Sequence, residues 1–270
     1  MPIQIKLAST NEEYDAVFRL RHEVMVGDGY AAPRSDARIY DRFDAFPTTR
    51  QIIALIEGEV VGTVRATIDS GAGTSVDAFY DFGAACSPSS TVIAAGSHFY
   101  IASQYRKHFQ LSTLLMGMFH YWLRRQGGRY VKGVMNPQTV SLMQRIGYAP
   151  IDEPRISPHD SLSFVPVLLD MERLRGPVGE LVGRQPDLEK DESFHRWYYS
   201  EGEPLTCPGG FMILQHGEVT IVPAGSHDSG SRRNNENTLH PGQEIAPHLF
   251  QTSALVAKSE VEVAVMSPSK

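Results

Sequence analysis

Residues 91–135 read TVIAAGSHFYIASQYRKHFQLSTLLMGMFHYWLRRQGGRYVKGVM, and this stretch decides the fold. Its first part, Thr91–Ile101, is typical of a buried strand, although Gly96 interrupts it. Its middle predicts the clearest helix of the chain, because apolar residues recur there at helical spacing and Gly127-Gly128 supplies a stop. Arg129–Met135 then predicts a second strand. The stretch therefore predicts a strand, a long helix and a strand in succession.

Helices and strands also alternate on both sides of this stretch. Ser9 to Glu12 has the S-x-x-E pattern of a capping box and predicts that a helix begins there. The other predicted elements are two strands joined by a tight turn at Gly58, a short helix and a last strand: Gln51–Glu57, Val60–Ile68, Pro137–Arg145 and Leu162–Leu169. This order predicts an α+β domain over residues 1–175.

The remainder of the chain differs in composition and in the pattern of its apolar residues. Residues 176–196 are polar and contain two prolines, so we expect a linker or a short helix there. Short β-rich runs separated by glycine turns then predict a small all-β roll over residues 197–270. Within it, FMILQHGEVTIV (residues 211–222) predicts a hairpin with Gly217 at its tip, and residues 223–237 a mobile hairpin tip.

The composition excludes several classes of protein. The 270 residues are 41% hydrophobic, enough for a core, but no apolar run approaches the length of a membrane span, roughly 18 residues. The net charge of −6 argues against a general nucleic-acid binder. The N-terminus lacks the apolar core of a secretory signal, and Cys86 and Cys207 form no disulfide pattern. We therefore expect a cytoplasmic globular protein.

Charged residues in the first half suggest a site. Arg21 falls on the apolar stripe of the first predicted helix, where an unpaired charge is costly, so it needs a carboxylate partner. Asp41 and Asp44 converge if their segment makes one turn, and Arg65 ends a nearby strand. This cluster is either a structural set of ion pairs or part of a functional site.

The ordered set of Arg21, Tyr30, Asp41, Asp44 and Arg65, within RLRHEVMVGDGY, YDRFD and VVGTVRAT, resembles the acyl-homoserine-lactone autoinducer synthases and the N-acyl amino acid synthases. The resemblance covers about residues 5–150. It implies a GNAT fold with an αβα arrangement around a central mixed sheet. It also implies that these five residues bind the amine substrate.

The resemblance implies a donor site on the strand and loop that precede the long helix. In the GNAT fold a glycine-rich loop at this place holds the pyrophosphate of coenzyme A; here Phe109 and Leu111 replace its small residues. A phosphopantetheine on an acyl carrier protein carries one phosphate and no nucleotide, and so needs a less open loop. We expect the donor to contact Phe99, Tyr100, Ile101, Arg106, Lys107 and Asn136.

Basic residues in this region favour the same donor. Acyl carrier proteins are acidic, and the cluster in sequence would attract one by charge. It comprises Arg106, Lys107, Arg124, Arg125, Arg129 and Lys132. A solvated helix end explains Arg124 and Arg125 equally well.

The catalytic positions depart from the resembled family. Its E-x-S-R-F motif corresponds here to Ala95-Gly96-Ser97-His98-Phe99, so the glutamate and the arginine are both replaced. His98 is the candidate base that takes the amine proton, and Ser97 the candidate for binding substrate or water. A satisfied core histidine is the alternative for His98. A tyrosine acid common in GNAT enzymes is replaced by Met143.

Residues 197–270 resemble a cyclic-nucleotide-binding β-roll in the spacing of their glycine-containing turns. Gln251 stands near the place of the arginine that neutralises the phosphate in that family. We therefore expect this module not to bind cyclic nucleotides, and to serve dimerisation, lid packing or another ligand. No histidine spacing typical of a metal site appears, so no metal is expected.

Together these features predict an N-acyltransferase that moves a long acyl group from an acyl carrier protein thioester to an amino acid or related amine. No tightly bound cofactor is expected, and the acyl donor is a substrate. Two alternatives remain open: an acyl-CoA-dependent N-acetyltransferase regulated by the β-roll, and a non-catalytic sensor of acyl ligands.

Overall fold

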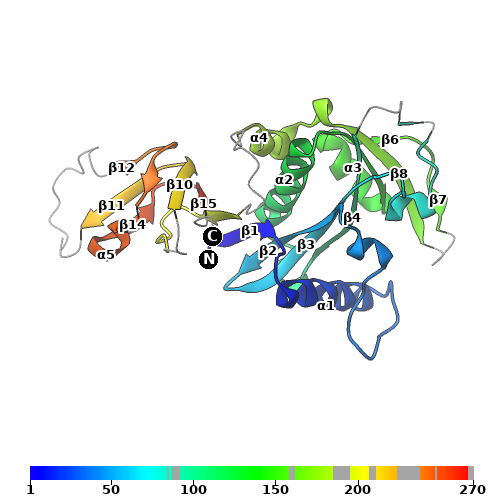
Figure 1. Cartoon of the computed structure of the whole chain (residues 1–270), viewed down its shortest axis with the longest axis horizontal. Coiled ribbons are helices and arrows are strands. Elements are labelled where there is room, and N and C mark those ends of the chain that lie inside the picture. The colour runs from blue at the N-terminus through cyan, green and yellow to red at the C-terminus, as the bar shows by residue number, and fades with distance from the viewer. Residues whose placement is uncertain are drawn as a thin grey trace. The chain divides into compact units, whose positions relative to one another are not determined.

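The computed structural model describes residues 1–83, 85–86, 92–157, 162–184, 195–206, 211–223, 238–246 and 248–266 (Figure 1). The chain divides into two compact units. The larger unit comprises residues 8–53 and 60–186, and the smaller unit comprises residues 1–7, 54–59 and 187–270.

A mixed sheet forms the centre of the larger unit, with strands in the order β2-β3-β4-β5-β8-β6. β4 and β5 pair in parallel, whereas β3 with β4, and β8 with β5 and β6, pair antiparallel. The strands are β2 (Thr49–Ile56), β3 (Glu59–Ile68), β4 (Val92–Ile101), β5 (Gly128–Met135), β6 (Ala149–Pro150) and β8 (Ser163–Asp170), and the short β7 (Arg155–Ile156) pairs with β8. The predicted α+β fold with a central mixed sheet is confirmed.

Helices cover this sheet on both faces. In Figure 1, α1 (Asn11–Gly27) lies on one side, and α2 (Phe109–Arg125), α3 (Pro137–Ile146) and α4 (Gly176–Arg184) lie on the other. The apolar stripe of α2 forms the core: Leu111, Leu115, Met118, Phe119 and Leu123 are all buried. Single 3₁₀ turns connect the elements at η1 (Arg42–Ala45), η2 (Ser75–Ala78), η3 (Ser103–Tyr105) and η4 (Met171–Arg173).

The first helix begins one residue later than its sequence suggested. Its N-cap is Thr10, whose hydroxyl accepts the Glu13 N–H at 3.2 Å, and the Glu13 carboxylate accepts the Thr10 N–H at 3.3 Å. The Glu13 carboxylate also accepts the Ser9 N–H at 2.8 Å. A T-x-x-E box therefore overlaps the predicted S-x-x-E box, and it caps the helix because Glu13 satisfies two free N–H groups.

The larger unit also differs from the expected domain of residues 1–175. β1 (Ile3–Leu7) pairs antiparallel with β9 (His195–Tyr199), so the N-terminal strand belongs to the smaller unit. At the other end, α4 occupies the start of the expected linker and buries Val178, Leu181 and Val182. These apolar side chains extend the larger unit beyond residue 175, because burying them removes apolar surface from water.

The smaller unit contains two sheets, β13-β10-β15-β9-β1 and β12-β11-β14. Its elements are β10 (Phe211–His216), β11 (Val219–Pro223), β12 (Thr238–Leu239), β13 (Glu244–Ile245), α5 (Leu249–Thr252), β14 (Ser253–Ala257) and β15 (Val261–Met266). Its buried core includes Met212, Leu214, Val219, Leu255 and Val263.

The hairpin predicted over residues 211–222 is wrong. β10 pairs with β13 and β15, whereas β11 pairs with β12 and β14, so the chain changes sheet at Gly217. Residues 224–237 of the expected mobile tip, and Cys207, lie outside the described residues. The resemblance of this unit to a cyclic-nucleotide-binding roll stays a prediction.

Replacing Gly147 by alanine should destabilise the larger unit. Gly147 ends α3 with a φ of 115°, and a Cβ there would lie 2.4 Å from the carbonyl oxygen of Arg173. We expect the free energy of unfolding to fall by about 1–3 kcal/mol in urea titrations. The matched control is Gly183→Ala in α4, where a Cβ meets nothing within 4 Å. Equal stability of the two variants would contradict the prediction.

Candidate active site

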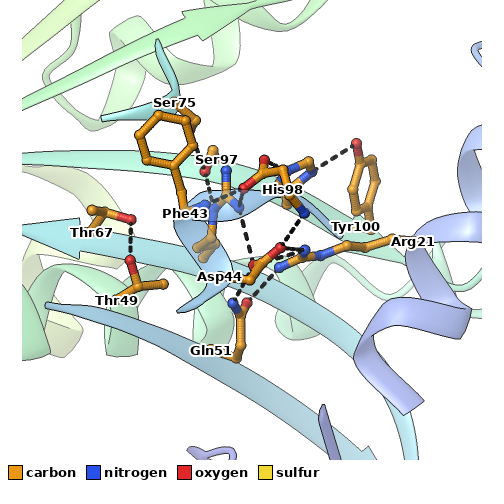
Figure 2. A network of polar contacts seen from close by, with 12 residues as sticks. Arg21, Phe43, Asp44, Thr49, Gln51, Thr67, Ser75, Ser97, His98 and Tyr100 are labelled. Atoms are coloured by element: carbon orange, nitrogen blue, oxygen red, sulfur yellow. Dashed lines mark hydrogen bonds and ion pairs between the residues drawn. The ribbon is translucent and has the colours of Figure 1, made fainter. Parts of the chain in front are cut away.

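A buried network of ion pairs joins α1 to η1 and β2 (Figure 2). The Arg21 side chain is fully buried, and its Nη1 donates to both Asp44 oxygens at 3.0 and 2.9 Å. Its Nη2 donates to Gln51 Oε1 at 2.7 Å, and Gln51 Nε2 donates to Asp44 Oδ1 at 2.9 Å. Arg21 therefore has the carboxylate partner that its place on the apolar stripe requires.

Arg65 extends this network to β4. Its Nη1 donates to Asp41 Oδ1 at 2.7 Å and lies 3.0 Å from Asp44 Oδ1, and its Nε donates to Ser97 Oγ at 2.9 Å. Asp41 and Asp44 converge because η1 is one capped turn: Asp41 accepts the Phe43 N–H, and Asp44 accepts the Asp41 N–H. The YDRFD motif therefore supplies both the turn and the two carboxylates.

His98 lies at a bulge in β4. Thr63 pairs with Tyr100 and Arg65 pairs with Ser97, so His98 and Phe99 together face the one intervening residue of β3. His98 has a φ of 51°, in the left-handed region that glycine usually takes at a bulge. This conformation costs a non-glycine residue about 1 kcal/mol or more. The strained backbone turns the imidazole toward the ion-pair network.

The contacts of His98 fix its tautomer. Its Nε2 lies 3.4 Å from Asp41 Oδ2, and its Nδ1 lies 3.4 Å from the Tyr100 hydroxyl. An ionised carboxylate only accepts hydrogen bonds, so Nε2 carries the proton and Nδ1 keeps a lone pair. Burial lowers the pKa of His98 to about 4, and the nearby Arg21 and Arg65 add to the effect although Asp41 opposes it. The imidazole is therefore neutral at neutral pH.

Both aspartates remain ionised. Burial alone would raise the pKa of Asp41, but hydrogen bonds from His98 and Arg65 outweigh it and hold this pKa well below its usual range. Burial likewise opposes ionisation of Asp44, and the charges of Arg21 and Arg65 bring its pKa below the ordinary value. The network thus balances two guanidinium groups with two carboxylates.

The sheet opens next to His98. β4 and β5 pair from Val92 with Gly128 up to Ala95 with Lys132, and in the described strands the pairing ends there although both strands continue. A cavity of about 900 Å³ lies at this opening. Apolar and aromatic side chains from η2, α2, β5, α3 and β8 line most of it: Val76, Phe79, Met116, Phe119, Val134, Met135, Leu142, Met143 and Phe164.

Most of the predicted site residues gather at this cavity. The predicted residues that line the cavity are Tyr30, Asp41, Arg65, Ser97, His98, Phe99, Tyr100 and Asn136. Arg21 and Asp44 lie behind them and hold Asp41 and Arg65 in place. Asn136 also caps α3, because its side chain accepts the Gln138 N–H. The helix stripe that the sequence indicated is core, except that Met116 and Phe119 reach the cavity.

Three predicted donor residues lie outside the cavity lining: Ile101, Arg106 and Lys107. Arg106 makes a two-pronged ion pair with Asp28 at the end of α1, with both N–O distances at 2.9 Å. Within the expected basic patch, Arg129 pairs with Asp170 and Glu172, and Lys132 pairs with Asp69 and Asp77. The patch is therefore less positive than its sequence suggests.

Sequence reasoning missed two polar residues of the site, Gln51 and Ser75, and assigned a third, Lys132, to the basic cluster and not to the cavity. Gln51 bridges Arg21 and Asp44, Ser75 donates to Ser97 Oγ at 3.3 Å, and Lys132 lines the cavity. Ser75 lies in a Gly/Ala/Ser-rich loop that carries no motif, and Gln51 opens an apolar strand. A polar residue inside an apolar strand was the one signal that could have identified Gln51 and Lys132.

Among the described residues, no group of His, Cys, Asp and Glu side chains is arranged to hold a metal ion. No helix in the described ranges combines the length and the apolar character that a membrane span requires.

The mixed sheet, its opened central strands and the charged cluster beside them define a GNAT-type acyltransferase fold. The family model of the N-acyl amino acid synthase FeeM matches residues 16–170, which is more than half of the chain. The chain therefore belongs to this family and is an N-acyltransferase.

Solved structures share the fold. FeeM, an N-acyl amino acid synthase from uncultured soil microbes, aligns with 16% identity over 64% of this chain and 93% of its own, with a TM-score of 0.54. BjaI, a CoA-dependent acyl-homoserine lactone synthase, is 20% identical over 67% of this chain and 87% of its own, with a TM-score of 0.55. The synthase LasI is 15% identical over 71% of this chain and 99% of its own, with a TM-score of 0.54. At these identities the likeness shows the fold alone.

A different relative appears among curated sequences. Protein ApaG of Rhodospirillum centenum is 37% identical over 75 residues, which cover 25% of this chain and 54% of that protein. The chain thus spans about half the length of this relative.

His98 should make the protein less stable in mild acid. The unfolded chain binds a proton at this histidine below about pH 6.5, whereas the folded chain resists protonation until about pH 4. Stability is therefore fully present above about pH 6.5 and falls between these two values. The buried His120, with a pKa also lowered to about 4, acts in the same direction.

The variant His98→Asn isolates the contribution of this one histidine. Asparagine tolerates a left-handed backbone and does not titrate. We expect its free energy of unfolding to drop less between pH 7 and pH 5 than that of the wild type, as measured by urea titration. An equal drop in both proteins would show that His98 is not the group responsible.

Proposed function

We propose that this enzyme transfers a fatty acyl group from an acyl carrier protein thioester to the amino group of an amino acid or a related amine. The observation that carries the proposal is a neutral, carboxylate-held imidazole at the polar end of a large apolar cavity. The polar end suits the acceptor amine, and the apolar remainder suits the acyl chain.

Asp41 is the group best placed to bind the acceptor. Its side chain is 38% exposed, in contrast to the 6% of Asp44. Its Oδ1 is taken by Arg65 and the Phe43 N–H, whereas the one contact of its Oδ2 with a described side chain is the long one with His98. A carboxylate oxygen with a free lone pair at the cavity surface attracts an ammonium group.

His98 is the proposed proton acceptor. An imidazole with a low pKa is a weak base toward a free ammonium, so the bound acceptor loses its first proton to solvent. We place the action of His98 after the resulting amine has attacked the thioester carbonyl. The amine nitrogen is then cationic and far more acidic, and His98 Nδ1 accepts its proton while Asp41 stabilises the imidazolium. The thiolate of the phosphopantetheine leaves as the C–S bond breaks.

Ser97 is the proposed donor to the developing oxyanion. Its oxygen accepts from Arg65 Nε at 2.9 Å and from Ser75 Oγ at 3.3 Å, which uses both lone pairs. Its own O–H is left to donate, and Ser97 lines the cavity. Main-chain N–H groups of β4 beyond Ala95, where pairing with β5 has ended, add further donors.

A carrier protein fits the donor loop better than coenzyme A does. The Arg106 guanidinium, which the loop offers to a phosphate, is engaged by Asp28. The Asp28 carboxylate beside the loop disfavours a doubly charged pyrophosphate more than a single phosphate diester. Lys107, Arg124 and Arg125 remain as the contacts for an acidic carrier protein.

The test compares long-chain acyl carrier protein with acetyl-CoA as donors. Each is offered a pool of amino acids, polyamines and S-adenosylmethionine, thiol release is followed, and products are identified by mass spectrometry. Amine-dependent release from the carrier protein alone supports the proposal and identifies the acceptor. Release from acetyl-CoA alone replaces it with a CoA-dependent N-acetyltransferase. Donor binding without release from either would overturn the proposed chemistry.

Replacing His98 by asparagine should abolish most of the transfer while the fold persists. We expect kcat to fall by about 10²- to 10⁴-fold, the usual contribution of a general base. Binding of the acyl donor should be nearly unchanged, because the apolar lining is intact. A kcat within a few-fold of the wild type would remove His98 from the mechanism and favour the structural interpretation of this histidine.

A further inference from the structure

Lys132 is a buried lysine on β5 that the proposed chemistry does not use. Its side chain is 5% exposed, and its ammonium binds two carboxylates. Nζ donates to Asp69 Oδ2 at 2.9 Å and to the Asp77 oxygens at 2.7 and 2.8 Å. Such short, multiple contacts on a buried ammonium hold the partner segment firmly in place.

The two carboxylates organise a loop, residues 69–79, that we call the wall loop. Asp69 Oδ1 accepts the Gly71 and Gly73 N–H groups at 3.0 and 3.2 Å. Asp77 Oδ2 accepts the Thr74 N–H at 2.6 Å and the Thr74 hydroxyl at 3.0 Å. The wall loop is therefore folded around the same two groups that Lys132 binds.

The wall loop forms one side of the cavity. Ser75, Val76, Ala78 and Phe79 line it, and the Phe79 ring meets the Phe164 ring of β8 edge to face, with centroids 5.8 Å apart. The proposed acceptor groups come from η1, β3 and β4, and Ser75 of the wall loop reaches this side of the cavity through its hydrogen bond to Ser97 Oγ. The apolar part of the wall loop thus faces the space left for an acyl chain.

Lys132 also stands at the closed end of the strand opening. It is the last β5 residue paired with β4, opposite Ala95, and it lines the cavity. Its ammonium binds the two carboxylates of the wall loop. The Lys132 side chain therefore links β5 to the wall loop at the point where the pairing of β4 with β5 ends.

We propose that Lys132 is a positioning residue that sets which acyl-chain lengths the enzyme uses, by tethering the wall loop across the apolar end of the cavity. The proposal rests on the proposed function, since it assigns the apolar part of the cavity to the acyl chain. Without the tether, the wall loop moves outward and longer chains fit.

The test measures chain-length preference in Lys132→Met and in the triple variant K132M/D69N/D77N. The triple variant removes the tether without leaving unpaired buried charges, and its asparagine oxygens still accept the loop N–H groups. The readout is the ratio of kcat/KM for a longer and a shorter acyl carrier protein. We expect this ratio to shift toward the longer chain by about tenfold, because one misfitted methylene in an apolar pocket is worth that much or more.

Two further measurements separate this proposal from the proposed function. Binding of a series of acyl pantetheines of increasing length is measured by calorimetry, which needs no transfer. Hydrogen exchange of residues 75–79 reports the tether directly and should accelerate in both variants. If no acyl group is transferred but the binding preference for chain length shifts, the proposed function is wrong and the proposed role of Lys132 is supported.

Arg129→Met is the matched control. Arg129 lies on the same strand and is ion-paired with Asp170 and Glu172, but it does not line the cavity. Its length preference and loop exchange should match the wild type. The proposal is overturned if folded Lys132 variants keep the wild-type preference and exchange, or if Arg129→Met shifts them equally.

Discussion

Two guanidinium groups that share one buried carboxylate hold the polar end of the cavity together. Arg21 comes from α1 and Arg65 from β3, and both reach Asp44, whose own turn places Asp41 at the cavity surface. Breaking a buried ion pair by removing one partner typically costs about 3–5 kcal/mol, because the remaining charge is left uncompensated. The proposed acceptor site therefore forms only when α1, η1 and β3 are all in the positions that allow these ion pairs.

The charge balance of this network explains how a histidine there can stay neutral. The two arginines and two aspartates compensate one another, so the protonation state of His98 is decided mainly by its burial. The family resemblance placed a glutamate and an arginine on β4, where this chain has Ala95 and His98. At these two positions this chain therefore has an alanine and an uncharged imidazole with a carboxylate neighbour.

Local sequence signals were enough for the strand, helix and strand at the centre of the larger unit and for the carboxylate partner that Arg21 needs. The apolar spacing of α2, the strand patterns and the cost of burying Arg21 alone each point to what the structure contains. The signals failed where a contact joins segments far apart in sequence. Neither the Lys132 contact with Asp77 nor the pairing of β1 with β9 has a local cause, so no spacing within either segment predicts it. The wrong hairpin at Gly217 has the same origin, because a turn signal does not say which strands will pair.

The bulge at His98 constrains the length of β4 as well as its composition. Side chains alternate between the two faces of a strand, and one extra residue resets that alternation. Ser97 and Arg65 are in register on one side of the bulge, and Tyr100 and Thr63 are in register on the other. Deleting one residue between Ser97 and Tyr100 would remove the bulge, and with it the backbone conformation that turns His98 toward the ion-pair network. Adding a residue there would shift the following side chains out of their register with β3. Natural variants of this enzyme should tolerate substitutions in that segment far more readily than insertions or deletions.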